Sequence, residues 1–370
     1  MMKIRAALAH SNGSPLSIED IELDAPQRDD VLVRITATGL CHTDLMVLDH
    51  APLPWPAVLG HEGCGIVERV GADVRGIAPG DAVVLTTMSC GACVNCLQDQ
   101  PSYCQQFRAL NMSGGYRPDG SCSHCQGERR LFGRFFGQSS FATHVLAHRR
   151  SVVKVDATLP LEQLAPLGCG IQTGAGAVLN TLRPQAGSTL AIFGAGAVGL
   201  AALMAGRLAG CSRLILVDRL PGRLALGREL GATDLIDASL VDSVAAVHEL
   251  TGGGVDASIE ATGVPAVMTQ AIAALGLNGC AVLVGAAGAT ASVTFNPTEL
   301  QSKHQSIKGS MMAGDGALPR TFIPELIAHW RAGRFPFDRL LQFYAFEDIN
   351  LAIQDARSGL AIKPVLRMTA

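Results

Sequence analysis

Four cysteines, the densest group of potential metal ligands in this chain, lie within the fifteen residues CGACVNCLQDQPSYC, at Cys90, Cys93, Cys96 and Cys104. Four thiolates form a complete tetrahedral shell around zinc, and such a shell leaves no coordination position for a substrate. In a reducing compartment, cysteines this close together are typical of metal ligands rather than of disulfides. The stretch therefore predicts a structural zinc site, the alternative being a group of free thiols.

Three further residues could hold a metal, although they are far apart in the sequence. Cys41 stands in GLCHTD, His61 in GHEG and Cys169 in PLGCGIQTG. A catalytic zinc needs three protein ligands and one open position, and two thiolates with one imidazole are one known set. Spacing alone does not group these residues, and each is equally well explained as a buried structural residue.

A glycine motif, GAGAVG, follows the apolar run TLAIF and precedes a helical pattern; its glycines are Gly194, Gly196 and Gly199. In this context it predicts a dinucleotide site. The first glycine permits a tight turn, the second lets the backbone approach a pyrophosphate, and the third lets helix and strand pack closely. Asp218 ends the next apolar run, LILVD. A carboxylate there favours NAD over NADP, although Arg219 and Arg223 follow it and could accept a 2′-phosphate.

These motifs need two kinds of domain to position them, and 370 residues suit two domains. Up to about residue 165, short β-like runs broken by glycine and proline predict an irregular, mostly antiparallel β domain. From about Thr173, strand and helix patterns alternate, which predicts a doubly wound parallel sheet. We predict a zinc domain over residues 1–170, completed by residues 312–370, and a dinucleotide domain over residues 171–311.

The charge distribution excludes some partners. The chain has 29 basic and 32 acidic residues, and no long run of either sign suggests nucleic acid or an anionic membrane. The uncharged segment 184–205 contains four glycines, which favours a strand, a turn and a helix over a membrane span. The N-terminal residues lack the apolar stretch of a signal peptide, so we expect a cytoplasmic protein.

The motifs together resemble one family over essentially the whole chain. GHEGCGIVERVG, the four-cysteine stretch, PLGCGIQTGAGAVLN, GAGAVG and the closing IKPVL are similar to the zinc-dependent medium-chain alcohol dehydrogenases. FFGQSSFATH and FPFDRL resemble the branch that acts on aryl and allylic primary alcohols, such as benzyl alcohol and geraniol dehydrogenases. The resemblance implies an α/β protein with a GroES-like catalytic domain and a Rossmann-type domain.

By this resemblance, Cys41, His61 and Cys169 hold a catalytic zinc, so that each subunit binds two zinc ions together with NAD. The zinc activates an alcohol whose hydride moves to the nicotinamide. Asp44 would orient the zinc-bound imidazole, and Glu62 would be a nearby carboxylate. The resemblance also assigns to Thr43 the hydroxyl that accepts the proton. It places His42 and Lys363 at the cofactor pyrophosphate and Thr173 and Val198 at the nicotinamide. It makes Phe135 and Phe136 lining residues of the substrate pocket. We include Arg223 among the expected cofactor contacts.

The sequence departs from the family at the end of the expected proton relay. Members have a histidine five residues after the first cysteine ligand, where this chain has Met46, which cannot titrate. His50 is nearby in sequence, but we do not transfer the role to it. We expect the proton to leave through the ribose hydroxyl and water instead.

A smaller cluster, Cys122, His124 and Cys125, precedes the two phenylalanines. It has no fourth ligand nearby, so we interpret it as free thiols and a surface histidine.

Three functions remain open at this stage. The favoured one is an NAD-dependent aryl or allylic alcohol dehydrogenase acting on a small molecule, with no nucleic acid or membrane partner. The second is a thiol-dependent formaldehyde dehydrogenase, and the third is a non-catalytic zinc and nucleotide binder. The family also implies a homodimer or homotetramer.

Overall fold

The computed structural model describes residues 1–112, 115, 117, 119–288 and 290–368. The chain divides into two compact units, which are taken one at a time below. The first consists of Met1–Cys169, Leu318–Pro324 and Asp338–Ala370, and the second of Gly170–Ala317 and Glu325–Phe337.

This division differs from the predicted one after residue 311, because residues 312–317 and 325–337 belong to the second unit. Tertiary contacts explain the difference. The Asn180 side chain donates to the carbonyl of Ala313 at 2.7 Å, and a Cβ on Gly176 would lie 2.5 Å from that same oxygen. Trp330 and Phe337 pack together with ring centroids 5.4 Å apart. None of these contacts is visible as a sequence period.

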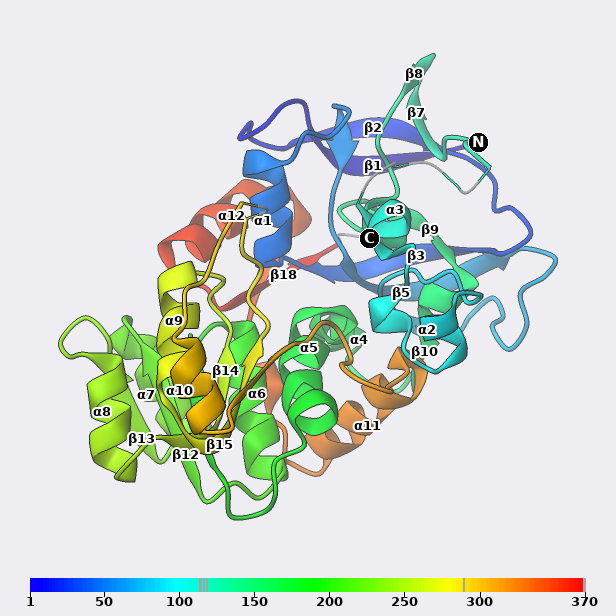
Figure 1. The fold of residues 1–370 in the computed structure, drawn as a ribbon. Coiled ribbons are helices and arrows are strands. Elements are labelled where there is room, and N and C mark those ends of the chain that lie inside the picture. The colour runs from blue at the N-terminus through cyan, green and yellow to red at the C-terminus, as the bar shows by residue number, and fades with distance from the viewer. Residues whose placement is uncertain (113–114, 116, 118, 289, 369–370) are drawn as a thin grey trace. The chain divides into compact units, whose positions relative to one another are not determined.

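Two β-sheets form the first unit (Figure 1). One has the order β4 (Ala57–Val58), β1 (Met2–Ala9), β2 (Ser17–Leu23), β7 (His124–Gln126) and β8 (Arg129–Arg130). The other has the order β10 (Val152–Lys154), β6 (Ala82–Leu85), β5 (Glu62–Val70), β3 (Asp30–Gly39), β18 (Lys363–Arg367) and β17 (Leu341–Ala345), with β9 (His144–His148) also pairing with β3. Among the described strands of this unit every pairing is antiparallel except β17 with β18.

The helices associated with this unit are mostly short. They are α1 (His42–His50), α2 (Val94–Leu97), α3 (Phe107–Asn111), α4 (Leu161–Leu164) and α12 (Ile349–Ser358), while α11 (Pro319–Arg331) begins in this unit and ends in the second. Single 3₁₀ turns occupy Pro101–Tyr103, Phe135–Gly137, Arg149–Ser151, Ala165–Gly168, Phe337–Leu340 and Phe346–Asp348. Strand β3 is an inner strand of this sheet, between β5 and β18, and eight of its ten residues are buried.

The second unit contains a six-stranded parallel sheet, as the alternating pattern predicts. Its order is β13 (Asp234–Asp237), β12 (Arg213–Asp218), β11 (Thr189–Phe193), β14 (Val255–Glu260), β15 (Leu275–Leu283) and β16 (Ser306–Gly309). Its helices are α5 (Gly170–Gly176), a wider turn over Ala177–Leu182, α6 (Ala197–Leu208), α7 (Pro221–Leu230), α8 (Ser243–Thr251), α9 (Pro265–Ala273) and α10 (Pro297–Ser302) (Figure 1). The strand order reverses between β11 and β14, and doubly wound folds bind nucleotides in the crevice outside the carboxyl ends of the strands at such a point.

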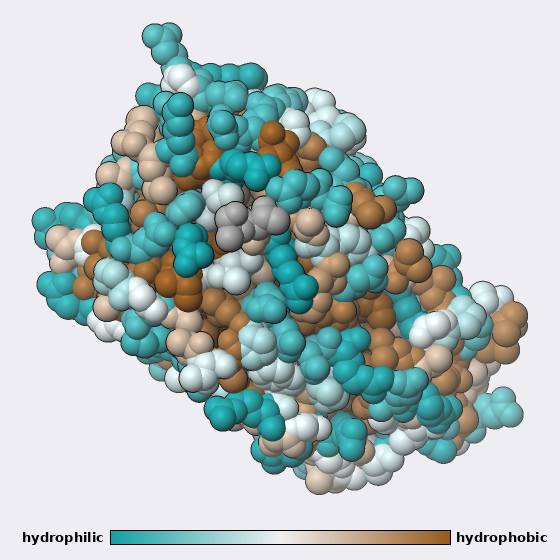
Figure 2. All heavy atoms as spheres, turned by 180° about the vertical axis from the view of Figure 1, so that it is seen from behind, coloured by the Kyte–Doolittle hydropathy of each residue, from teal (hydrophilic) through white to brown (hydrophobic). Residues whose placement is uncertain are grey.

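In the described part of the chain, no helix has the length and apolar character that crossing a membrane requires. The uncharged segment 184–205 forms β11, the glycine turn and most of α6, as predicted. On the face drawn in Figure 2, hydrophilic and hydrophobic residues are intermixed.

Candidate functional site

The three dispersed ligands meet in the first unit. Cys41 caps the start of α1, His61 lies directly before β5, and Cys169 follows the 3₁₀ turn Ala165–Gly168. Their two Sγ atoms and the imidazole nitrogen all lie within 4.8 Å of one another, and all three residues are buried. Antiparallel pairing of β3 with β5 achieves this, because it brings Gly39, two residues before Cys41, opposite Glu62.

Asp44 fixes which imidazole nitrogen of His61 is available. Its Oδ1 lies 2.8 Å from His61 Nδ1 and accepts the Gly60 N–H at 3.1 Å, while its Oδ2 accepts the Cys41 N–H at 2.9 Å. The carboxylate therefore ties two ligand segments together from a position in the first turn of α1. His61 Nε2 is left buried without a hydrogen-bond partner among the described residues. A metal ion would satisfy this nitrogen.

The charges around the three ligands favour a cation. The hydrogen bond between the two thiols lowers the pKa of Cys41 well below its ordinary value and raises that of Cys169. Burial disfavours the imidazolium, but the charges of Asp44 and Cys41 outweigh it and raise the pKa of His61. A bound divalent cation takes the place of such protons, because ligating thiols and imidazoles are deprotonated. Two sulfurs and one nitrogen are a donor set that zinc accepts, so the residues fit the ion.

Glu62 and Lys363 form a buried ion pair beside these ligands. Lys363 Nζ lies 2.9 and 3.0 Å from the two carboxylate oxygens and donates to the carbonyl of Leu40 at 3.1 Å. A Cβ on Gly39 would lie 2.0 Å from Glu62 Oε2, so only glycine leaves room for the carboxylate. Burial alone would lower the pKa of Lys363, but the charges of Glu62 and Cys41 raise it. The pyrophosphate role predicted for Lys363 stays a prediction; in the structure its ammonium is paired with Glu62.

The two predicted pocket phenylalanines pack against the metal ligand. Phe136 stacks on the His61 ring with centroids 4.4 Å apart and an interplanar angle of 24°, and Phe135 meets the same ring edge-on at 5.5 Å. Both are buried, 0% and 5% exposed for Phe135 and Phe136 respectively. Their contact with a substrate stays a prediction, whereas their contact with His61 is part of the folded structure.

The four clustered cysteines also converge. Their Sγ atoms lie within 4.8 Å of one another, with Cys90 and Cys96 3.9 Å apart and Cys93 and Cys104 4.0 Å apart. A tetrahedron with zinc–sulfur bonds of about 2.3 Å requires sulfur separations of about 3.8 Å. Hydrogen bonds from backbone N–H groups, first that of Cys96, lower the pKa of Cys93 to about 6. Burial, in contrast, raises the pKa of Cys96 to about 12, so it is the geometry of the four sulfurs that fits a closed zinc site.

Replacing Cys93 with serine should remove one equivalent of zinc and lower the stability of the first unit, because binding energy at a structural metal site is folding energy. We expect stability to change more than turnover. Metal analysis and thermal unfolding measure the two effects, and Cys211→Ser, a half-buried thiol outside both clusters, is the control. If the Cys93→Ser protein kept its stability and lost only turnover, the assignments of the two metal sites as structural and catalytic would have to be exchanged.

The glycine turn of the second unit has the geometry that a dinucleotide site needs. Gly194 has φ +101°, and a Cβ on Gly199 would lie 1.7 Å from the Gly194 carbonyl oxygen. A Cβ on Gly196 would meet nothing within 4 Å. The first glycine thus permits the turn, the third permits close packing, and the second leaves the N-terminus of α6 open to a phosphate.

Asp218 lies against this turn at the end of β12. Its Oδ2 accepts the Ala195 N–H at 2.6 Å, and its Oδ1 accepts the backbone N–H groups of Arg219 and Leu220. The carboxylate is thereby oriented by two loops at the carboxyl edge of the sheet, where doubly wound folds bind the ribose.

The other predicted cofactor residues lie as follows. In the second unit, Thr173 on α5 and Val198 on α6 belong to helices in close contact, since a Cβ on Gly174 would be 2.0 Å from the Val198 carbonyl oxygen. Arg223 lies in the first turn of α7. In the first unit, His42 is exposed and Thr43 half-buried at the start of α1, with Thr43 Oγ1 3.8 Å from Cys41 Sγ. Their roles toward a cofactor or substrate stay predictions.

Two residues near these sites were missed by the sequence analysis. Gln138 is fully buried and binds both sides of the His61 segment: its Oε1 accepts the Gly63 N–H at 3.0 Å and its Nε2 donates to the His61 carbonyl at 2.9 Å. Glu260 ends β14, and its Oε1 accepts from the backbone of Thr262 and Gly263. A polar residue closing a buried parallel strand could have signalled Glu260, but no sequence pattern signals Gln138.

The interpretation of His124 as a surface residue is wrong. The residue is 1% exposed, and its ring fills the space beside Gly133, where a Cβ would lie 2.1 Å from Nδ1. Burial lowers its pKa to about 3. Pairing of β7 with β2 turns this side chain inward. Cys122 and Cys125 are half-buried thiols, and the described residues around them form no metal-binding group.

Met46 and His50 both lie on α1, and His50 is exposed at its last turn. We predict that His50→Ala leaves the pH dependence of turnover largely unchanged, because no hydrogen bond among the described residues links this imidazole to the metal ligands. A pH–rate profile from pH 5 to 10 measures this. Disappearance of the near-neutral limb in the variant would assign the relay to His50 after all.

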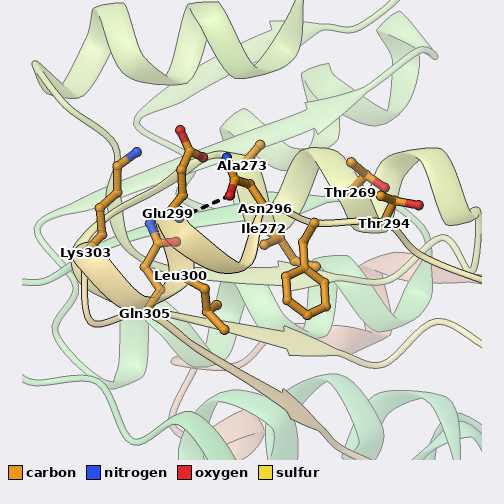
Figure 3. Close-up of a pocket in the computed structure, with 10 residues that line it drawn as sticks. Thr269, Ile272, Ala273, Thr294, Asn296, Glu299, Leu300, Lys303 and Gln305 are labelled. Atoms are coloured by element: carbon orange, nitrogen blue, oxygen red, sulfur yellow. Dashed lines mark hydrogen bonds between the residues drawn. The ribbon is translucent and has the colours of Figure 1, made fainter.

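One well-formed pocket of the second unit, of about 320 Å³, is separate from all of these residues. It lies at α9 and α10, where Asn296 accepts from the first turn of α10 (Figure 3). Its lining includes none of the predicted metal or cofactor residues, so we do not assign the activity to it.

Two family models cover most of the chain. Residues 27–157 match the alcohol dehydrogenase GroES-like domain, and residues 197–328 match the zinc-binding dehydrogenase model. The fold and the site thus define the class as a zinc-binding dehydrogenase, an oxidoreductase of two dissimilar domains.

Individual relatives narrow the class. The chain is 45% identical over 363 residues to geraniol dehydrogenase of Castellaniella defragrans, which covers 98% of this chain and 97% of that protein. Among solved structures, it matches an alcohol dehydrogenase zinc-binding domain protein from Burkholderia ambifaria (49% identity, TM-score 0.96) and benzyl alcohol dehydrogenase of Acinetobacter calcoaceticus (42% identity, TM-score 0.96), each over 100% of both chains. The chain belongs to the zinc-dependent medium-chain alcohol dehydrogenases, in their aryl and allylic alcohol branch, as its motifs predict.

Proposed function

We propose that this dehydrogenase transfers hydride between NAD and an aryl or allylic primary alcohol or its aldehyde. The observation that carries the proposal is the buried, unpartnered Nε2 of His61 facing the thiols of Cys41 and Cys169. Three ligands leave a fourth position for a substrate oxygen, unlike the closed four-cysteine site. The substrate class rests on the geraniol and benzyl alcohol dehydrogenases to which the chain is similar.

The residues of the chain would divide the work. Bound zinc supplies Lewis-acid activation of the alcohol oxygen, and the nicotinamide accepts the hydride. Asp44 binds Nδ1 of His61 and so holds the ring in the tautomer whose Nε2 is available to a metal. The Lys363 ammonium balances the negative charge of Glu62 beside the two cysteine sulfurs. Thr43, two residues after Cys41, offers the hydroxyl that accepts the alcohol's hydrogen bond. Met46 cannot titrate, so a bound cofactor's ribose hydroxyl and water would have to carry the proton that Thr43 receives.

We also propose NAD as the cofactor and two zinc ions per subunit. Asp218, oriented at the glycine turn by three backbone N–H groups, supports NAD because a carboxylate binds the ribose hydroxyls and repels a 2′-phosphate. The four-cysteine and three-ligand groups support the zinc count.

For the assembly, we propose a homodimer or homotetramer in the cytoplasm. Strand β16 lies at the edge of the parallel sheet, where a strand of a second copy could pair. Light scattering of the purified protein measures this, and a monomer at micromolar concentration would contradict it.

A substrate panel tests the proposed activity. Benzyl, cinnamyl and geranyl alcohols should give higher kcat/KM than ethanol, and NADH should form faster than NADPH. Formaldehyde with and without glutathione is included as a discriminating arm, because thiol-dependent turnover would favour formaldehyde dehydrogenase. Ethanol outperforming every unsaturated alcohol would contradict the substrate class, and absence of turnover with zinc bound would favour a non-catalytic binder.

A further inference from the structure

The two metal sites of the first unit are joined by a chain of aromatic rings. Phe107, on α3, meets Phe136 edge-on with centroids 6.0 Å apart and an interplanar angle of 80°. Phe136 in turn stacks on the imidazole of His61 at 4.4 Å. One end of this chain begins three residues after Cys104, and the other end is a ligand of the three-residue site.

The four-cysteine lobe fixes the first ring. The Phe107 N–H donates to the carbonyl of Cys104 at 2.8 Å, so the backbone that carries the ring is attached directly to a metal ligand. At the other end of α3, the buried Asn111 side chain donates to the Phe107 carbonyl at 2.8 Å and bonds both the N–H and the carbonyl of Met88. Helix α3 has only five residues and would not persist alone. Its position therefore depends on the lobe at one end and on Met88 at the other.

The second ring is held in an uncommon backbone conformation. Phe136 has φ 50° and ψ 35°, in the left-handed region that is unfavourable for a non-glycine residue. Neighbouring bonds hold it there: Ser139 Oγ accepts the Phe135 N–H and donates to the Val58 carbonyl, and Gln138 bonds the His61 and Gly63 backbone. Such local strain is maintained where the surroundings over-determine it. The result is that the Phe136 ring lies flat on His61.

The imidazole is therefore held by three kinds of contact. Asp44 binds its Nδ1, Gln138 binds its backbone carbonyl, and the rings of Phe135 and Phe136 contact its ring. Of these residues, Phe136 is the one whose ring meets Phe107 beside the four-cysteine lobe. Rotating the ring of Phe136 would move the face on which His61 rests. Two edge contacts oppose this rotation: that of Phe135 at 4.7 Å and, from the four-cysteine lobe, that of Phe107 at 6.0 Å.

We propose that Phe107 is a positioning residue for the catalytic metal site, through which the four-cysteine zinc lobe holds Phe136 against the ligand His61. The proposal rests on the two-zinc function proposed above. It assigns the closed zinc site a second task beyond stability: maintaining the geometry of the open one. Residues that do this act through other groups and do not touch the substrate.

The test uses the full-length enzyme with zinc in the four-cysteine site and cobalt in the three-ligand site. Phe107→Ala should keep two metals per subunit. It should shift the cobalt absorption bands and speed removal of cobalt by a chelator about two- to tenfold, since an aromatic pair contributes that factor in stability. Phe107→Tyr, which keeps the ring, should restore both values. Leu97→Ala, an exposed site on the same lobe, should leave both unchanged.

The outcomes separate this inference from the proposed function. Cobalt bands and release rates in Phe107→Ala equal to those of the wild type would overturn the inference, as would equal changes in Leu97→Ala. Failure of the wild type to hold a metal in the three-ligand site would overturn both. A metal-loaded wild type without alcohol turnover would overturn the proposed activity alone, because the cobalt readouts do not depend on turnover.

Discussion

Replacing Lys363 with methionine should lower the free energy of unfolding of the first unit by about 3–5 kcal/mol. The change leaves the Glu62 carboxylate, 0% exposed, without its cation and next to two thiols. Water cannot reach the carboxylate, so solvent cannot replace the ammonium partner that it loses. Methionine fills nearly the same volume, which keeps a cavity from contributing to the loss.

The chain allows this loss to be measured in the first unit alone. Trp55 and Trp330 are its two tryptophans, and only Trp55 is in the first unit. In a Trp330→Phe background, urea unfolding followed by fluorescence therefore reports that unit. Glu62→Gln/Lys363→Met should regain more than half of the lost stability, because both charges of the pair are then removed together.

An exposed pair provides the matched control. Arg34 and Glu68 are joined at 3.3 Å, with the Arg34 side chain 52% exposed, and Arg34→Met should change stability by no more than about 1 kcal/mol. A Lys363→Met protein as stable as this control would mean that the Glu62–Lys363 pair is not buried in solution.

Replacing His61 with alanine should lower kcat/KM by about 10³-fold or more and remove one of two zinc ions. A metal that activates a substrate oxygen supplies several kcal/mol of transition-state stabilisation, and each 1.36 kcal/mol is a factor of ten. The four-cysteine zinc should remain, because its ligands are complete without His61. Metal analysis and initial rates of NADH formation measure the two effects.

His50→Ala is the control, since it removes an exposed histidine of the same unit. It should retain two zinc ions and wild-type turnover. A His61→Ala protein that kept both zinc ions and most of its activity would contradict the assignment of Cys41, His61 and Cys169 as the open metal site.

Local sequence features predicted much of this protein. The GAGAVG turn between an apolar strand and a helix requires glycine at two positions. Gly194 has φ +101°, and a Cβ on Gly199 would lie 1.7 Å from the Gly194 carbonyl oxygen. The four cysteines were equally readable, since ligands within fifteen residues meet without help from the rest of the fold. The alternation of strands and helices predicted the parallel sheet.

The open metal site was not readable from spacing. Cys41 and Cys169 are 128 positions apart, and only the resemblance to a family grouped them with His61 before the structure did. The same holds for the assignment of residues 312–317 to the second unit, where Ala313 accepts a hydrogen bond from Asn180, 133 positions away. Exposure was misjudged at His124, where sheet pairing turned a polar side chain inward.

The sequence by itself therefore determined what depends on neighbours along the chain: the glycine turn, the four-cysteine lobe and the order of strands and helices. The tertiary structure alone decided the environment of each group. It placed Lys363 against Glu62, presented His61 Nε2 by binding Nδ1 to Asp44, and laid Phe136 on the imidazole. Burial, charge pairing and ring stacking arise between segments remote in sequence, and the chemistry of the open metal site depends on all three.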